Sequence, residues 1–250
     1  MSDAAVSLNS ITKVYKRSHL GKTTLIPGVK DITFTVAPGE VFGLLGLNGS
    51  GKTTTLKLLL GLLFPTSGEA RLFGKPAGSR AAKETLGYLP EIPYFYRHLT
   101  GHEVLSFYGS LSGLSSDSLR RRVDAVLEEV RMTAAARRPM REYSKGMLQR
   151  IGLAQAMLHN PRLLVFDEPV TGLDPLGLRE MRVIIQNLND AGKTVLFSSH
   201  SISEVEKLCH RVGVLVKGQL VRVVNRAEWT GGDPLEDIFV RTVDPEGRRS

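Results

Sequence analysis

The feature that constrains this sequence most is a glycine-rich segment between a short apolar run and a leucine-rich run. The segment reads Gly-Leu-Asn-Gly-Ser-Gly-Lys-Thr over residues 46–53. Val41 to Leu45 before it is typical of a strand buried on both faces, and Thr53 to Leu63 after it is typical of a helix. Strand, glycine loop and helix in this order open an α/β fold and match the complete P-loop motif, which binds nucleotide phosphates.

Each residue type in this segment has a chemical reason to be there. Glycines let successive backbone N–H groups turn toward phosphate oxygens, and the following helix adds its positive N-terminal end. Lys52 can reach the β- and γ-phosphates, and the Thr53 hydroxyl is a candidate Mg²⁺ ligand. The predicted nucleotide-phosphate site comprises Gly46, Leu47, Asn48, Gly49, Ser50, Gly51, Lys52, Thr53 and Thr54. A second Gly-Lys-Thr-Thr, at residues 21–24, lacks both the first glycine and the helix, and is interpreted as a loop.

Two acidic residues follow a second apolar run. Leu163 to Phe166 predicts a buried strand that delivers Asp167 and Glu168 at its C-terminal end. In open α/β sheets, ligands bind at those strand ends. We expect Asp167 to hold Mg²⁺ through water and Glu168 to orient and polarise an attacking water.

A third motif is Tyr-Ser-Lys-Gly-Met-Leu-Gln-Arg over residues 143–150, which precedes an apolar helix. Ser144 is interpreted as an N-cap, with backbone amides exposed after it. Such a helix end is a second anion site, and the P-loop already provides one. The motif therefore suggests a γ-phosphate reached from another subunit, although by itself it also fits a plain N-cap.

A helical stretch interrupts the α/β pattern. Thr100 with Glu103 three residues later is a capping box, and residues 119–130 carry apolar side chains at helical spacing. We expect one domain over residues 1–230, with a core at 1–98 and 159–230 and a helical subdomain at about 99–158. A C-terminal tail is expected at 231–250, polar from Asp233 onward and loose at its end. Further strands are expected over residues 6–15, 32–36, 194–198, 212–216 and 220–224, and helices over residues 176–189 and 201–208.

Composition excludes several classes of protein. Cys209 is the single cysteine of 250 residues, so no intrachain disulfide can form, and a reducing compartment fits. The longest apolar stretch, residues 58–64, is far shorter than the ~18 residues of a membrane span, and no secretory signal is expected. The formal net charge of +8 is interpreted mainly as solvated helix faces. His98 and His102 are four residues apart, but the predicted helix begins between them, so no metal pair is expected.

Taken together, the motifs resemble the ATPase subunit of an ABC transporter, over about residues 7–219. Lys52 matches the Walker A lysine, Asp167 the Walker B aspartate, and residues 144–146 resemble the signature loop, with Ser144 and Gly146 as nucleotide contacts. The resemblance implies a P-loop NTPase (RecA-like) core with an N-terminal antiparallel β-subdomain and an inserted α-helical signature subdomain. It implies ATP and Mg²⁺ as the bound species.

The resemblance also assigns roles to residues outside these motifs. Residues 172–174 resemble the D-loop with Asp174, His200 resembles the switch histidine, and Tyr15 stands where the family stacks an aromatic ring on adenine. Glu91 replaces the family's usual glutamine but can still ligate Mg²⁺. Lys145 and Met147 depart from the signature. Residues 235–239 resemble the tail of the branch that pairs with drug, polysaccharide and lipid exporters.

The function implied is an ATP-hydrolysing subunit that dimerises, with itself or a related ATPase subunit, around two ATPs. It would drive a separate integral membrane permease, an exporter, from the cytoplasmic face of the inner membrane, with no nucleic acid partner. The alternative is a soluble ABC-type ATPase acting on ribosomes or DNA, which usually carries two cassettes or a long coiled coil. A switch without turnover is disfavoured by Glu168 and His200.

The aromatic cluster at residues 92–96 predicts either permease docking or a seam between core and insert.

Overall fold

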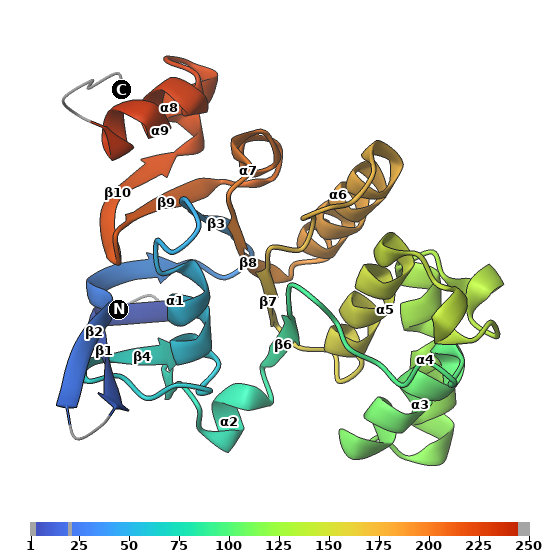
Figure 1. Cartoon of the computed structure of the whole chain (residues 1–250). Helices are drawn as coiled ribbons and strands as arrows, with labels where there is room; N and C mark the ends of the chain where they lie inside the picture. The colour runs from blue at the N-terminus through green and yellow to red at the C-terminus, as the bar shows by residue number, and fades with distance from the viewer. Residues whose placement is uncertain (1–3, 20–21, 245–250) are drawn as a thin grey trace. The chain divides into compact units, whose positions relative to one another are not determined.

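The computed structural model describes residues 4–19 and 22–244, whose contacts divide into two compact units (Figure 1). Unit 1 comprises the described residues up to 83 and from 194 onward, and unit 2 comprises residues 84–193. Among the described helices, none has the length and apolar character that a membrane span requires. The subdomain boundaries expected at residues 99 and 158 stay a prediction.

An antiparallel sheet forms the N-terminal part of unit 1, with strand order β2-β1-β4-β5. Its strands are β1 (Val6–His19), β2 (Lys22–Val36), β4 (Ser67–Leu72) and β5 (Lys75–Pro76). The loop expected at residues 21–24 is wrong for Lys22–Thr24, because these residues pair with β1 and begin β2, while Gly21 lies outside the described residues. The β1–β2 register shifts at three points, the last of them between Lys13 and Val14.

A second set of strands in unit 1 has the order β10-β9-β3-β8. These strands are β3 (Val41–Leu45), β8 (Thr194–Ser199), β9 (Arg211–Val216) and β10 (Gln219–Asn225). β3 runs parallel to β8 and β9, and all five of its residues are buried, as its continuous apolar run predicts. The helices of this part are α1 (Lys52–Leu59), α2 (Arg80–Lys83) and α7 (Ile202–Leu208).

Two helices follow β10, α8 (Arg226–Thr230) and α9 (Leu235–Val243). Residues 235–243 of the expected C-terminal tail are therefore helical. Leu235, Ile238 and Phe239 stand at helical spacing and bury their side chains, which fixes α9 to the unit. Residues 245–250, the end of the expected tail, lie outside the described residues.

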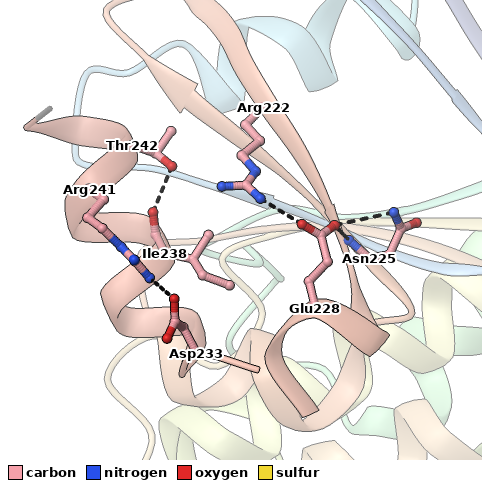
Figure 2. A network of polar contacts seen from close by, with 7 residues as sticks. All are labelled: Arg222, Asn225, Glu228, Asp233, Ile238, Arg241 and Thr242. Atoms are coloured by element: carbon pink, nitrogen blue, oxygen red, sulfur yellow. Dashed lines mark hydrogen bonds and ion pairs between the residues drawn. The ribbon is translucent and has the colours of Figure 1, made fainter. Parts of the chain in front are cut away.

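Polar contacts brace this C-terminal part (Figure 2). Glu228 accepts a hydrogen bond from the backbone N–H of Asn225 at 2.8 Å, which caps α8, and another from Arg222 at 2.6 Å. Arg241 pairs with Asp233 at the start of α9. Because these ion pairs are exposed, they add little stability, and the buried apolar side chains of α9 carry most of it.

Unit 2 contains a parallel strand pair and four α-helices among its residues, all of which are described. The strands are β6 (Leu86–Leu89) and β7 (Leu163–Asp167), and the helices are α3 (Gly101–Leu111), α4 (Ser116–Glu129), α5 (Lys145–Met157) and α6 (Pro175–Asp190), with 3₁₀ turns at Thr133–Ala135 and Met140–Glu142. Figure 1 shows α3, α4 and α5 gathered together. The capping box is confirmed, since Thr100 accepts from Glu103 N at 3.2 Å and donates its own N–H to the Glu103 carboxylate at 2.8 Å.

Candidate nucleotide-binding site

The glycine-rich segment joins the end of β3 to the start of α1, as the sequence predicts. Gly51 is the N-cap of α1 and has a φ of 105°, a conformation that a residue with a Cβ adopts only with strain. The loop therefore turns tightly into the helix, and the first N–H groups of α1 lack partners within the helix itself. This is the geometry with which a helix N-terminus binds an anion.

Lys52 lies inside this loop and is only 6% exposed. Its Nζ donates to the carbonyl oxygen of Gly46 at 2.7 Å and to that of Leu47 at 3.4 Å. Ser50 Oγ is buried and has no hydrogen-bond partner in the described part of the chain. A buried hydroxyl without a partner beside a buried ammonium fits a site that takes a phosphate group.

Tyr15 and His200 lie in the same unit as the loop. The Tyr15 hydroxyl is 3.2 Å from Thr54 Oγ1, which fixes the half-buried ring beside α1. Leu45 at the end of β3 pairs with Ser199 at the end of β8, so His200 emerges at the same edge of the sheet as the loop. The His200 side chain is exposed.

Of the two predicted acidic residues, Asp167 ends β7 in unit 2 and Glu168 follows it directly. Both are buried, with exposed fractions of 4% and 7%. Glu168 has a φ of 49°, in the left-handed region. Burial, together with the negative charges of Asp167 and Glu91, raises the pKa of Tyr88 to about 12. Tyr88 pairs with Val165, two residues before Asp167, so Tyr88 and Asp167 share a face of the strand pair. The phenol therefore stays a neutral hydrogen-bond donor near two carboxylates.

Glu91 itself is exposed, and its backbone carbonyl accepts a hydrogen bond from the amide of Gln149 at 2.8 Å. Gln149 is buried on α5, so the start of this helix and the segment after β6 are tied together. Neither Gln149 nor Tyr88 was singled out from the sequence. Their roles depend on contacts across the fold, for which the sequence carries no local signal.

Ser144 is confirmed as the N-cap of α5, because its hydroxyl accepts from Met147 N at 3.3 Å. Asp174 caps α6 in the same way, accepting from Gly177 N at 2.7 Å. These two caps lie close together, since a Cβ built on Gly146 would stand 3.7 Å from a methyl group of Leu173. The signature-like and D-loop-like segments therefore form one surface of unit 2.

The aromatic cluster at residues 92–96 contains both exposed and buried side chains. Tyr94 is 86% exposed, and Ile92 and Tyr96 are exposed as well. Phe95 is buried and packs edge-on against Tyr108 of α3, with ring centroids 6.1 Å apart. For Phe95 the docking interpretation is wrong, because its ring fills the space between its own segment and α3.

The predicted site residues thus fall into two sets. Unit 1 holds Tyr15, the loop residues 46–54 and His200, and unit 2 holds Glu91, Ser144, Gly146, Asp167, Glu168 and Asp174. Across the described ranges no cluster of three or more His, Cys, Asp or Glu side chains could hold a metal. Fold and site together define a P-loop nucleotide-binding protein.

Comparisons with known proteins give the family. The sequence model described as ABC transporter matches residues 29–171, more than half of the chain. The bacitracin transport ATP-binding protein BcrA of Enterococcus faecalis is 40% identical over 226 residues, which are 89% of this chain and 70% of that protein. The linearmycin resistance ATP-binding protein LnrL of Bacillus subtilis is 35% identical over 229 residues, 90% of this chain and 73% of that protein. The chain therefore belongs to the ABC transporter family, among its ATP-binding subunits.

Comparisons with solved structures give the same family as the sequence comparisons. An ATP-binding subunit of an ABC transporter superposes with a TM-score of 0.79 at 28% identity, covering 95% of this chain and 99% of that one. CbiO1 of Clostridium perfringens, described as part of the ABC transporter complex cbiONQ, gives 0.79 at 26% identity, with 98% and 96% covered. The predicted fold class and the assignment to an ABC ATPase are confirmed. The chain spans about two thirds of the length of two further curated ABC transporter ATP-binding proteins that it matches, 65% of one and 67% of the other.

Proposed function

We propose that this chain hydrolyses ATP as the energy-coupling subunit of an ABC exporter and drives a separate integral membrane permease. The observation that carries the proposal is the buried Lys52 ammonium inside a P-loop turn, 2.7 Å from the Gly46 carbonyl. An ammonium in that position can exchange the carbonyl for phosphate oxygens as ATP enters. The family of the chain supplies the transport context.

The loop residues 46–54 would cradle the phosphates, and Tyr15 would stack on the adenine. Thr53 of unit 1, and Asp167 and Glu91 of unit 2, are each proposed as a Mg²⁺ ligand, since hydroxyl and carboxylate oxygens are the donors that this ion prefers. Bound there, Mg²⁺ would neutralise part of the phosphate charge. Lys52 adds a second positive charge on the phosphates, so the loop stabilises the charge that develops during phosphoryl transfer.

Glu168 is proposed as the group that polarises the attacking water and accepts its proton. The buried carboxylate accepts a hydrogen bond from the Thr171 hydroxyl, which helps to fix its orientation. His200, exposed after β8, would hold the γ-phosphate end of the site. Both groups argue for turnover rather than for a nucleotide-binding switch.

We propose that Ser144, Gly146 and Asp174 act on an ATP held by the P-loop of a second copy or of a related subunit. Ser144 and Asp174 are exposed N-caps of α5 and α6, helices of 13 and 16 residues. The N-terminus of α5 can therefore face an anion brought by a partner. Two ATPs would be enclosed in such a dimer.

The permease is proposed to dock beside the exposed aromatic residues of unit 2. A hollow of about 390 Å³ there is lined by aromatic and apolar residues and by the polar side chains of Ser112, Gln155 and His159. Tyr94 lines this hollow and is mostly exposed, and large rings that are already ordered are favoured anchors. Glu91, three residues earlier, would link the docking surface to the Mg²⁺ ligands.

Export and location are proposed from the relatives. BcrA and LnrL are described as serving bacitracin transport and linearmycin resistance, which suits an exporter. The net charge of +8 suits attachment to the anionic cytoplasmic face of the inner membrane. A ribosome- or DNA-directed ATPase has less support, because the relatives described above are transporter subunits, and no nucleic acid partner is proposed.

Two measurements on tagged protein in its native host test the proposal. Phosphate release by the purified chain should require Mg²⁺ and disappear in Lys52→Ala. In cell fractions the chain should sediment with membranes and dissociate when the permease is extracted. A chain that follows the ribosomes through a salt gradient, with no membrane-bound share, would favour the alternative.

A further inference from the structure

A β-bulge lies directly before Tyr15 in the β1–β2 hairpin. Lys13 pairs with Val29, but the next residue, Val14, pairs with Pro27. Gly28 is thus the extra residue of β2, because no residue of β1 stands opposite it between Lys13 and Val14. Bulges often lie next to functional sites, where they change the direction of a neighbouring side chain.

The Tyr15 ring occupies the space that a side chain at Gly28 would need. A Cβ built on Gly28 would lie 2.5 Å from Cε2 of Tyr15 and 3.2 Å from Cδ2. Gly28 does not have the left-handed φ that several other glycines of the chain have, so its backbone accepts alanine. The obstacle to a side chain is the ring, with the carbonyl oxygen of Lys13 at 3.2 Å as a lesser one.

Two further contacts complete the socket around Tyr15. The Tyr15 hydroxyl meets Thr54 Oγ1 of α1 at 3.2 Å. The Lys13 ammonium lies 5.7 Å from the ring centroid, within cation–π range, and is held there by a bond of 2.7 Å to the carbonyl oxygen of Phe64. The ring is therefore fixed by groups from β1, β2 and α1, all within unit 1.

We propose that Gly28 is a positioning residue for ATP, because its missing side chain sets the orientation in which the Tyr15 ring meets the purine base. This inference rests on the proposed role of Tyr15 as the adenine platform. Stacking requires parallel rings at contact distance, so a displaced ring loses much of the attraction. The Tyr15 hydroxyl meets Thr54 of the predicted phosphate site, but a Cβ at Gly28 would meet the ring carbons and the Lys13 carbonyl, so the effect should fall on the base. Gly28 should consequently affect affinity for ATP and leave affinity for a triphosphate without a base unchanged.

The test compares Gly28→Ala, Tyr15→Ala and the double variant in the full chain. Equilibrium binding of ATP and of inorganic tripolyphosphate is measured without Mg²⁺, which prevents turnover. Tyr15→Ala should weaken ATP binding about tenfold, as expected for one lost base–aromatic stack. Gly28→Ala should weaken it at least about threefold, the double variant should match Tyr15→Ala, and tripolyphosphate binding should stay constant throughout. Gly231→Ala, whose Cβ would meet only the Ala227 carbonyl at 3.3 Å, is the matched control.

The outcomes separate the inference from the function on which it rests. If Tyr15→Ala weakens ATP binding and Gly28→Ala does not, the platform stands and the inference is wrong. If Tyr15→Ala binds ATP as the unmodified chain does, Tyr15 does not stack on the adenine, and both that proposed role and the inference about Gly28 are wrong. Because the clash with the ring can destabilise the fold of Gly28→Ala, the Tm of the single and double variants is measured as well. If Gly28→Ala lowers the Tm and the double variant restores it, the contact between Gly28 and the Tyr15 ring is supported. If the Tm stays low in the double variant, the clash is with the Lys13 carbonyl, and the inference is wrong.

Discussion

The Thr171 hydroxyl donates a hydrogen bond of 2.9 Å to Oε2 of Glu168. Glu168 is buried at the end of β7 with a φ of 49°, a strained backbone conformation of the kind that clusters at functional sites. The hydrogen bond and the turn together hold the carboxylate in one orientation. A general base held in this way loses little entropy when the water arrives, which is the basis of the first prediction.

Glu168→Gln should keep ATP binding and reduce ATP turnover by at least about 100-fold, because the amide preserves shape but does not accept the proton. Removing the charge also relieves repulsion with the γ-phosphate, so ATP-bound dimers should accumulate. Phosphate release and gel filtration with ATP measure the two effects. Thr171→Val should give a smaller loss of turnover, since the carboxylate stays but is less well oriented. Hydrolysis at the unmodified rate in Glu168→Gln would assign the base to another residue.

Lys52→Ala should abolish ATP turnover while the chain still folds. The ammonium is buried, but its bonds go to loop carbonyls, so alanine removes a phosphate contact and leaves the apolar core intact. ATPase assay and circular dichroism check the two halves of the prediction. Lys57→Ala, an exposed lysine of the same helix, is the control and should retain full activity. Normal turnover in folded Lys52→Ala would contradict the P-loop assignment.

Ser144→Arg should be inactive yet bind one ATP per monomer, because Ser144 is proposed to act on the ATP of a partner. A large cation at this N-cap removes the bond to Met147 N and opposes the positive helix end. Mixing Ser144→Arg with Lys52→Ala should partly restore ATPase activity, since one of the two shared sites is then intact. Loss of ATP binding by the isolated Ser144→Arg monomer would mean that the loop acts on its own chain.

Much of the fold was readable from local patterns. β3 was predicted with its observed bounds because a run buried on both faces needs no alternation, and the Thr100 capping box marked the start of α3 within one residue. Composition does not indicate α9, because charged residues stand among Leu235, Ile238 and Phe239, although these three side chains are spaced as one helix face. The P-loop and acidic residues could be recognised because their chemistry is local in sequence.

Other parts of the site could not be predicted, because they depend on register and packing. The bulge at Gly28 arises from how two long strands align, and one glycine beside a proline gives no sign of it. Tyr94 and Phe95 are adjacent and chemically alike, but only one is buried. Which of them faces the core depends on where α3 places Tyr108, and no pattern within the segment itself specifies that.

His159→Gln should make the stability of the chain less sensitive to acid. Burial lowers the pKa of His159, and the charges of Arg122 and Lys193 lower it further, against the opposing effect of its bond to the Leu86 carbonyl. As pH falls below about 6.5, the unfolded chain binds a proton that the folded chain resists, so the free energy of unfolding falls. Glutamine can keep a donor to Leu86 without titrating. Urea unfolding at several values between pH 8 and 5 gives the slope, and an equally steep slope in His159→Gln would contradict the prediction.

The last prediction separates docking from folding at two neighbouring aromatic residues. Tyr94→Glu should fold normally and keep the basal ATPase activity of the isolated subunit, because the ring is 86% exposed. It should release the subunit from membranes and stop transport, since a charge replaces a proposed interface anchor. Phe95→Glu should instead unfold or lose several degrees in Tm, because its carboxylate would be buried against Tyr108 without a partner. Membrane fractionation, ATPase assay and thermal unfolding on both variants give the answer, with Tyr94→Phe as the control that keeps the ring. If Tyr94→Glu stays bound to membranes and transports normally, the permease docks elsewhere on the chain.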